Sequence, residues 1–308
     1  MFHSNRLWLV FATVTTVSWG IWGALLALPV ASGFPDTLGY VVWSFTMIPP
    51  SLIALAKIGW KLDRDSLSLG MGFAAGGLGA GGQLILFRTV PAVAPAYLVF
   101  PFIALSPLVT ILLAALIAKE RVLTIGWIGI ILALIAGVML NYQTSGVTGY
   151  VDPSWLLYAL AVLVAWGLQG YVISHANKLL RAESIFFYMM FTGVALAPVA
   201  VWMTDRAELF SWGWDQLGLS IAIQSLNSIG ALLLVYAFRY GKAMIVAPLI
   251  NAGAPVITAI LSLILMGTIP EMIPGLGIVL AVIATLLMAV SEESTTAIQE
   301  GAADREAK

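Results

Sequence analysis

Long apolar segments follow one another along almost the whole chain, separated by short stretches with charged residues, proline or asparagine. Each segment has about the 20 residues that an α-helix needs to cross a hydrocarbon core roughly 30 Å thick. Residues 291–308 are polar and acidic, which predicts a disordered cytoplasmic tail. The pattern predicts ten transmembrane helices, at about residues 7–29, 37–56, 67–88, 92–118, 122–141, 154–175, 184–203, 215–238, 243–267 and 272–290.

The composition places this chain in a lipid bilayer. Hydrophobic residues make up 61% of the 308 residues and charged residues 9%, whereas about 25% of the residues of a soluble domain are charged. The net charge of −1 and the lack of a basic run argue against a nucleic-acid partner. The sequence has no cysteine, which excludes disulfides and thiolate chemistry. We expect no metal and no cofactor.

The distribution of lysine and arginine predicts the orientation of the helices, because short cytoplasmic connections carry an excess of both residues. With the amino terminus inside the cell, the outer connections hold only Arg88 and Arg206. The cytoplasmic connections then hold Arg6, Lys57, Lys61, Arg64, Lys119, Arg121, Lys178, Arg181, Arg239 and Lys242. We therefore expect a multi-pass protein of the inner (plasma) membrane with both termini in the cytoplasm.

Two short motifs recur at nearly the same distance along the chain. Residues 16–23 (TVSWGIWG) are similar to residues 163–170 (LVAWGLQG) at an offset of 147, and residues 107–110 (PLVT) to residues 255–258 (PVIT) at an offset of 148. Each unit therefore contains five helices, and because five is odd the second unit enters the membrane from the opposite face. The repeat predicts an all-α fold of two inverted units, an arrangement typical of secondary transporters. The units would cover residues 1–145 and 146–290.

These motifs resemble a known family. The pattern consists of a Trp-Gly pair in the first helix of each unit, a proline in the fourth helix, a glutamate at the end of the fourth helix, and glycines along the fifth. In this sequence the corresponding residues are, in that order, Trp19-Gly20 and Trp166-Gly167, Ser106-Pro107-Leu108-Val109-Thr110, Lys119-Glu120-Arg121, and Gly129 with Gly137. The chain resembles the ten-helix EamA-type members of the drug/metabolite transporter superfamily, which implies transport of an amino acid, a sugar, a nucleobase or a drug. The second unit departs from the pattern at Thr268, Glu271 and Thr285.

Polar side chains inside the predicted helices are the best guide to a binding site, because in hydrocarbon they face other helices or a water-filled cavity. Gln224 and Asn227 are three residues apart and so share one helical face. The amides either line a substrate cavity or join helices through hydrogen bonds. The candidates are Gln83, Gln169, Gln224, Asn227 and Asn251.

Aromatic residues within the spans are further candidates, since their rings stack on an apolar ring, a sugar or a cation. Trp19 and Trp166 occupy equivalent positions beside a glycine, so they either bind substrate or define the packing of the fold. Trp22 and Gln169 are also equivalent but differ between the repeats, as a ligand-contacting position would after duplication. Tyr97, near the start of the fourth span, completes the candidate site.

Glycine and proline set expectations for helix geometry. Seven glycines between residues 70 and 82 predict close helix approach or a hinge in the third span. Prolines at positions 91, 95, 101 and 107 predict an interrupted fourth span, and Pro248 and Pro255 predict the same in the ninth. Interrupted helices expose backbone groups to the substrates of transporters.

Together these features predict a secondary transporter that moves a small neutral or zwitterionic metabolite (an amino acid, a sugar or a nucleobase-like compound) through a central cavity by alternating access. Its partners would be this small-molecule substrate and the lipid bilayer, and it would be a monomer or a homodimer. A membrane receptor or scaffold that binds a small molecule without transport is the alternative. We do not expect an enzyme, because two histidines without a buried acid supply no nucleophile with its base.

Overall fold

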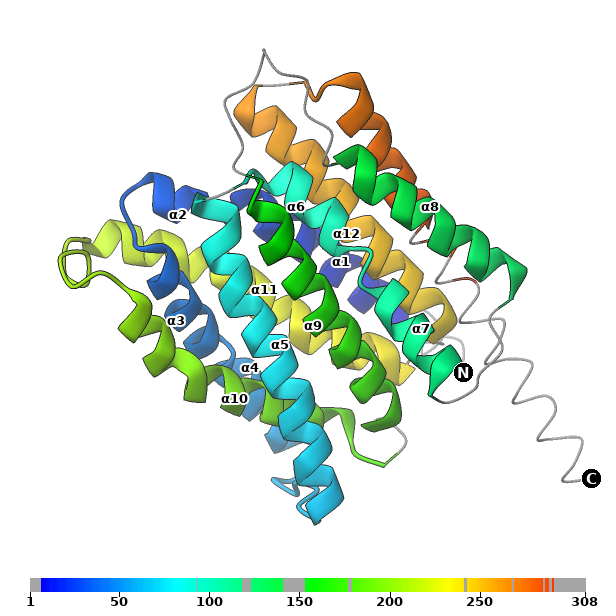
Figure 1. Ribbon diagram of the computed structural model, residues 1–308. Helices are drawn as coiled ribbons and strands as arrows, with labels where there is room; N and C mark the ends of the chain where they lie inside the picture. The colour runs from blue at the N-terminus through cyan, green and yellow to red at the C-terminus, as the bar shows by residue number, and fades with distance from the viewer. Residues whose placement is uncertain are drawn as a thin grey trace, which may run out of the picture.

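The computed structural model describes residues 7–92, 94–117, 123–140, 153–176, 179–240, 243–267, 269–284, 286–287 and 290. Within these residues every regular element is a helix (Figure 1), which confirms the all-α prediction. The helices are α1 (Leu7–Leu25), α2 (Leu28–Ala31), α3 (Asp36–Thr46), α4 (Ile48–Lys57), α5 (Ser66–Ala92), α6 (Ala96–Ile103), α7 (Pro107–Leu116), α8 (Thr124–Leu140), α9 (Trp155–Ala176), α10 (Ala182–Met203), α11 (Trp214–Tyr240) and α12 (Ala243–Met266).

Several predicted features lie outside the described residues. They are the tail at residues 291–308, the run Lys119-Glu120-Arg121, and Arg6, Lys178, Lys242, Thr268 and Thr285. The side chains of Arg239 and Asn251 also lie outside the described part, although the backbone of both residues is helical.

The helices are those of a polytopic membrane protein. In the described residues, six are long and apolar enough to cross a bilayer: Leu7–Ala31, Asp36–Lys57, Ser66–Val90, Trp155–Ile173, Ala182–Met203 and Trp214–Leu234. Shorter apolar helices lie at Thr124–Ala136, Gly253–Met266 and Met272–Ala284. In chain order, the helices follow the ten apolar segments of the sequence.

Proline explains where one predicted segment is interrupted. The fourth segment is divided as expected: α6 ends at Ile103 and α7 begins at Pro107, because proline has no amide hydrogen to donate to the preceding turn. The second segment is also divided, at Met47, where two prolines open α4. The interruption expected in the ninth segment is wrong, since α12 is one helix through Pro248 and Pro255. A membrane helix tolerates proline where neighbouring groups satisfy the freed backbone carbonyl.

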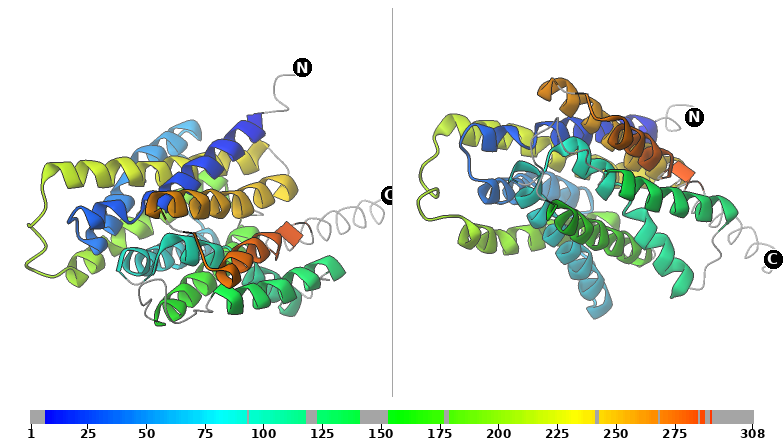
Figure 2. Two further views of the ribbon diagram at one scale, coloured as in Figure 1. Left: turned by 90° about the horizontal axis from the view of Figure 1, so that it is seen from above. Right: turned by 45° about the horizontal axis from the view of Figure 1, so that its top comes forward.

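The most extensive helix contacts join the first half of the chain to the second. α1 packs along α11 and α12, while α9 packs along α5 and α7. α10 lies against α3, α4 and α5. The two views of Figure 2 show α1 beside α12 and α9 beside α5. The two halves are therefore interleaved in one bundle.

Glycines allow these helices to cross closely. A Cβ atom at Gly20 of α1 would lie 2.5 Å from Cβ of Ile257 on α12. A Cβ atom at Gly167 of α9 would likewise lie 2.5 Å from Cβ of Val109 on α7. Real Cβ atoms do not approach one another so closely, so only glycine permits these two crossings.

The tryptophan of each Trp-Gly pair occupies a second close crossing. A Cβ atom at Gly230 of α11 would lie 2.6 Å from Nε1 of Trp19, and one at Gly82 of α5 would lie 2.6 Å from Nε1 of Trp166. The same contact thus occurs twice, because Trp166 follows Trp19 by 147 residues and Gly230 follows Gly82 by 148 residues. Four of the seven glycines between residues 70 and 82 lie against side chains of α9 or α10, as close helix approach requires: Gly72, Gly76, Gly79 and Gly82.

Replacing Gly82 with alanine is expected to lower the melting temperature of the detergent-purified protein. The new methyl group would collide with the Trp166 indole, which outweighs the roughly 1 kcal/mol by which alanine favours a helix over glycine. Gly81→Ala is the matched control, because a Cβ atom there meets open space. A melting temperature for Gly82→Ala equal to that of the control would contradict the close crossing.

Candidate functional site

The nine residues predicted to bind substrate come from six helices. They are Trp19 and Trp22 on α1, Gln83 on α5, Tyr97 on α6, Trp166 and Gln169 on α9, Gln224 and Asn227 on α11, and Asn251 on α12. Their contacts separate them into a buried polar pair, an unpaired amide and a set that holds helices together. Tyr97 packs, half-buried, against the main hydrophobic cluster. The substrate-binding role of all nine stays a prediction.

One polar pair joins the two halves of the chain deep in the bundle. The indole Nε1–H of Trp22 donates a hydrogen bond to Oε1 of Gln224 over 2.8 Å. Trp22 is 4% exposed and Gln224 is 1% exposed. The ring of Phe100 on α6 meets the Trp22 ring edge-on, with centroids 5.6 Å apart. Both residues were candidates from the sequence, but only the fold pairs two positions that lie 202 residues apart.

Gln83 offers a hydrogen-bond donor that the described residues do not use. The residue is 4% exposed, and its buried Nε2 has no partner in the described part of the chain. A buried polar group without a partner costs about 1–3 kcal/mol. A bound molecule that presents an acceptor to this amide would recover that free energy.

The other two tryptophans and Gln169 join helices. Trp19 Nε1 donates to the carbonyl oxygen of Asn227 over 3.1 Å, and Trp166 Nε1 donates to that of Gly79 over 3.3 Å. Gln169 Nε2, one turn further along α9, donates to a carbonyl oxygen of α5 over 3.0 Å. These bonds show the packing role that was one of the two interpretations of the sequence.

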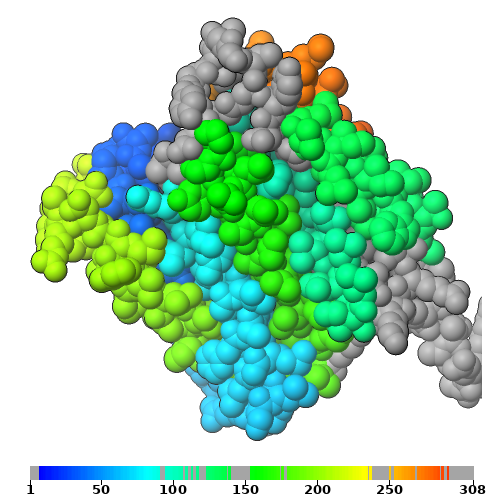
Figure 3. All heavy atoms as spheres, viewed as in Figure 1, coloured from blue at the N-terminus to red at the C-terminus, as the bar shows by residue number. Residues whose placement is uncertain are grey.

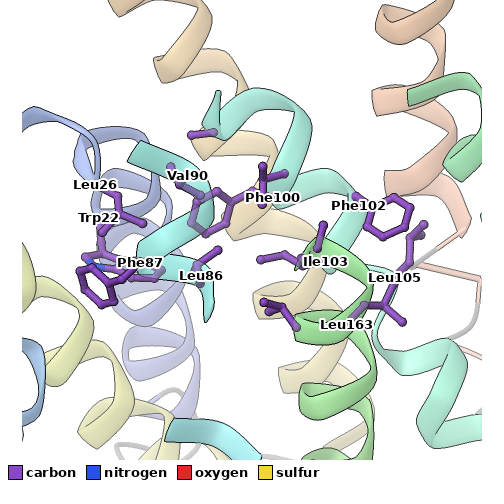
Figure 4. Packing of buried hydrophobic residues seen from close by; sticks show 14 of the residues in the cluster. Trp22, Leu26, Leu86, Phe87, Val90, Phe100, Phe102, Ile103, Leu105 and Leu163 are labelled. Atoms are coloured by element: carbon purple, nitrogen blue, oxygen red, sulfur yellow. The ribbon is translucent and has the colours of Figure 1, made fainter. Parts of the chain in front are cut away.

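Tyr40 and Phe87 lie in the same buried cluster as Trp22 and were not among the candidates. The ring centroid of Tyr40 on α3 lies 5.2 Å from that of Trp43 and 6.3 Å from that of Phe87 on α5. Figure 4 shows Trp22 and Phe87 in this cluster, where α1, α5 and α6 meet. The three-residue spacing of Tyr40 and Trp43 within an apolar segment is the signal that sequence reasoning could have used.

Two ion pairs link elements near opposite ends of α5. Nη1 of Arg88, close to the last turn of α5, lies 2.9 Å from Oδ2 of Asp36 on α3. Asp63 precedes α5, and its Oδ1 lies 2.9 Å from Nη2 of Arg181 at the start of α10. The hydroxyl of Tyr188 on α10 also donates to the Asp63 carbonyl oxygen. We refer to these two ends of the bundle as the Asp36 end and the Asp63 end.

The contacts of Asp63 change its acidity. Side-chain hydrogen bonds from Arg181 lower the pKa of Asp63 below its usual value of 3.8, while partial burial opposes this effect. The backbone N–H of Arg181 adds a further hydrogen bond to the carboxylate, over 2.8 Å. Because the lowered pKa belongs to the folded state, the stabilisation is fully present above the ordinary pKa and is lost as pH falls through the lowered pKa.

Two clefts lie along the seam between α5 and α9. Their volumes are about 470 and 400 Å³. Neither is lined by Trp22, Gln83 or Gln224, and these three side chains are almost fully covered by their neighbours. A substrate would reach them only after helices move.

Comparison with known proteins agrees with this architecture. Residues 153–290 match the EamA-like transporter family. The chain is 25% identical over 249 residues to protein RarD of Streptomyces exfoliatus. This match covers 77% of this chain and 72% of that protein. It is 46% identical over 82 residues to an uncharacterized protein of Methanocaldococcus jannaschii; the match covers 25% of this chain and spans 57% of that relative's length.

A solved crystal structure shares the fold, with a TM-score of 0.61 at 17% sequence identity over 90% of this chain and 95% of the other chain. The chain is therefore a polytopic helical membrane protein. The match of its second half to the EamA-like transporter family and its similarity to RarD are consistent with a membrane protein of the drug/metabolite transporter superfamily.

The Trp22–Gln224 hydrogen bond is tested by a double-mutant cycle on the purified protein. Trp22→Phe and Gln224→Leu are each expected to lower the free energy of unfolding, because each removes one partner of the bond. The double variant should lose less than the sum, by about 0.6 kcal/mol, the average for hydrogen bonds between membrane helices. Trp166→Phe combined with Gln224→Leu is the control, and its effects should add. Additive losses in the Trp22 cycle would show that the two side chains do not interact.

Lowering the pH is expected to destabilise the protein partly through Asp63. As pH falls below the ordinary pKa of 3.8 and then through the lowered pKa, the Asp63–Arg181 bonds weaken. Asp63→Asn should therefore have a lower melting temperature than the native protein at neutral pH. Its melting temperature should fall less than that of the native protein when the pH is lowered. Glu208→Gln, at an exposed loop residue, is the control. Melting temperatures of Asp63→Asn and the native protein that fall in parallel from pH 7 to well below pH 3.8 would refute this role.

Proposed function

We propose that this protein is a secondary transporter that moves a small neutral or zwitterionic metabolite, such as an amino acid, a sugar or a nucleobase-like compound, by alternating access through a central cavity. Two buried polar features carry this proposal: the Trp22–Gln224 bond, which joins the two halves, and the Gln83 amide, which lacks a partner in the described residues. Polar groups at membrane depth are costly and usually mark a substrate pathway.

Two inverted five-helix units would supply the motion. Gly20 packs against Ile257, and Gly167 packs against Val109. Gly167 is the repeat equivalent of Gly20 and Ile257 that of Val109, so the same contact occurs with the two halves exchanged. The Trp19 and Trp166 crossings behave in the same way. This correspondence supports a two-fold relation between the halves, and inverted repeats of this kind rock around a site near the midplane.

Each end of the bundle has a contact between the halves that opening would break. At the Asp36 end, the hydroxyl oxygens of Thr37 on α3 and Thr204 after α10 lie 2.6 Å apart. At the Asp63 end, Arg181 holds Asp63. Alternating access would release one of these contacts while the other stays formed. From the lysine and arginine distribution, the Asp63 end is cytoplasmic in this proposal, in a plasma membrane with both termini inside.

The chemistry of the candidate site supports a substrate without net charge. None of the nine site residues is charged. Glutamine side chains both donate and accept hydrogen bonds, and the aromatic rings offer flat apolar faces. The Gln83 donor suits a carbonyl or carboxylate oxygen of a small metabolite.

Reconstitution into liposomes tests the proposal. Purified protein in proteoliposomes should exchange at least one radiolabelled amino acid, sugar or nucleobase in a counterflow assay. Gln83→Leu should weaken the apparent affinity for that substrate about tenfold, since about 1.4 kcal/mol of hydrogen bonding is lost. Ser225→Ala is the control, because this hydroxyl donates to the Ile221 carbonyl oxygen of its own helix.

Two results would count against this proposal, the first against transport and the second against the Gln83 site. Saturable binding of a metabolite without any flux would favour the receptor or scaffold. Flux that Gln83→Leu leaves unchanged would place the substrate elsewhere in the bundle.

A further inference from the structure

The two clefts between α5 and α9 follow one another along the same seam. The first, of about 470 Å³, is entirely apolar and is lined by Leu78, Leu157, Leu160, Ala161, Val164, Ala165 and Leu168. The second, of about 400 Å³, is lined by Ser66, Leu67, Gly70, Met71, Ala74, Tyr171, Val172 and His175. We call both clefts together the α5–α9 groove.

The spacing of the lining residues makes the groove continuous. On α5 they recur every three or four residues from position 67 to position 78, and on α9 they do so from position 157 to position 175. Residues at this spacing lie on one face of a helix. The α9 stretch rises about 27 Å, close to the roughly 30 Å of a hydrocarbon core.

The groove lies on an exposed face of the bundle. The α9 span is only 22% buried, the lowest share of the six candidate spans in the described residues. Leu157, at one end of the groove, is 71% exposed. Figure 3 shows α9 (green) beside α5 (cyan) on the face turned to the viewer.

The two ends of the groove differ in chemistry. At the Asp63 end, Ser66 and His175 border the groove, and the exposed side chains of Lys61 and Arg64 lie in the loop just before α5. The neighbouring Asp63 is engaged by Arg181. Asp65, also in this loop, accepts hydrogen bonds from Ser68. The far end of the groove has only aliphatic lining residues.

We infer that the α5–α9 groove binds a phospholipid with an anionic headgroup, with its acyl chain along the aliphatic lining and its headgroup at Lys61 and Arg64. Basic residues at the edge of a membrane span attract anionic lipids. A second copy of the chain fits less well, because a symmetric contact across this groove would bring Lys61 and Arg64 of both copies to the same place. Since α5 and α9 belong to different halves, the bound lipid bridges them.

Native mass spectrometry of the full chain tests the headgroup. The protein is titrated with phosphatidylglycerol and with phosphatidylcholine of identical acyl chains, and phosphatidylglycerol should bind more tightly. Lys61→Gln with Arg64→Gln should weaken phosphatidylglycerol binding by about fivefold per charge removed and leave phosphatidylcholine unchanged. Arg206→Gln, an exposed arginine in another loop, is the control and should have no effect.

Filling the groove tests the acyl chain. Ala161→Phe should weaken binding of both lipids, whereas Val199→Phe, on an exposed position of α10, should weaken neither. Equal affinity for the two lipids, or phosphatidylglycerol binding that survives both the charge and the filling substitutions, would overturn the inference. So would a dimer that Ala161→Phe dissociates, since it would show that a second copy occupies the groove.

Discussion

Close approach of helices from the two halves of the chain is the constraint on which this structure depends. In a bilayer, helices gain little from hiding apolar side chains from lipid, because the lipid tails are equally apolar, so association relies on tight packing and hydrogen bonds between helices. Gly20, Gly82, Gly167 and Gly230 provide the space for such packing, and each receives a side chain of the opposite half. The two halves are therefore interleaved in the folded bundle.

The same crossings position the Trp22–Gln224 pair. Trp22 follows Trp19 by one turn of α1, and Gln224 precedes Asn227 by one turn of α11. Once the Trp19 indole bonds to the carbonyl of Asn227, the next turn of each helix brings the Trp22 indole to the Gln224 amide. A packing contact thus sets the geometry of the candidate site. The packing residue Trp19 and the candidate site residue Trp22 are therefore neighbours along α1.

Charged contacts lie at the ends of the bundle, where water competes for them. The Arg88 and Arg181 side chains are 54% and 40% exposed, and exposed ion pairs of this kind contribute about 0–1 kcal/mol. Contacts of such strength favour one conformation but can break when the protein changes conformation. The candidate site, by contrast, contains neutral amides and rings, whose contacts cost no charge desolvation when helices shift.

The sequence by itself determined the helical membrane class, the approximate spans, the duplicated motifs and most members of the candidate site, because hydropathy and repeats are properties of short stretches of chain. It did not identify Tyr40 and Phe87, and it wrongly expected an interruption in α12. Only the tertiary structure decided that Trp22 meets Gln224, that Arg88 meets Asp36 and that Gln83 finds no acceptor among the described residues. Such pairs depend on where and at what angle helices cross, and that is set by side-chain packing between residues far apart in the chain.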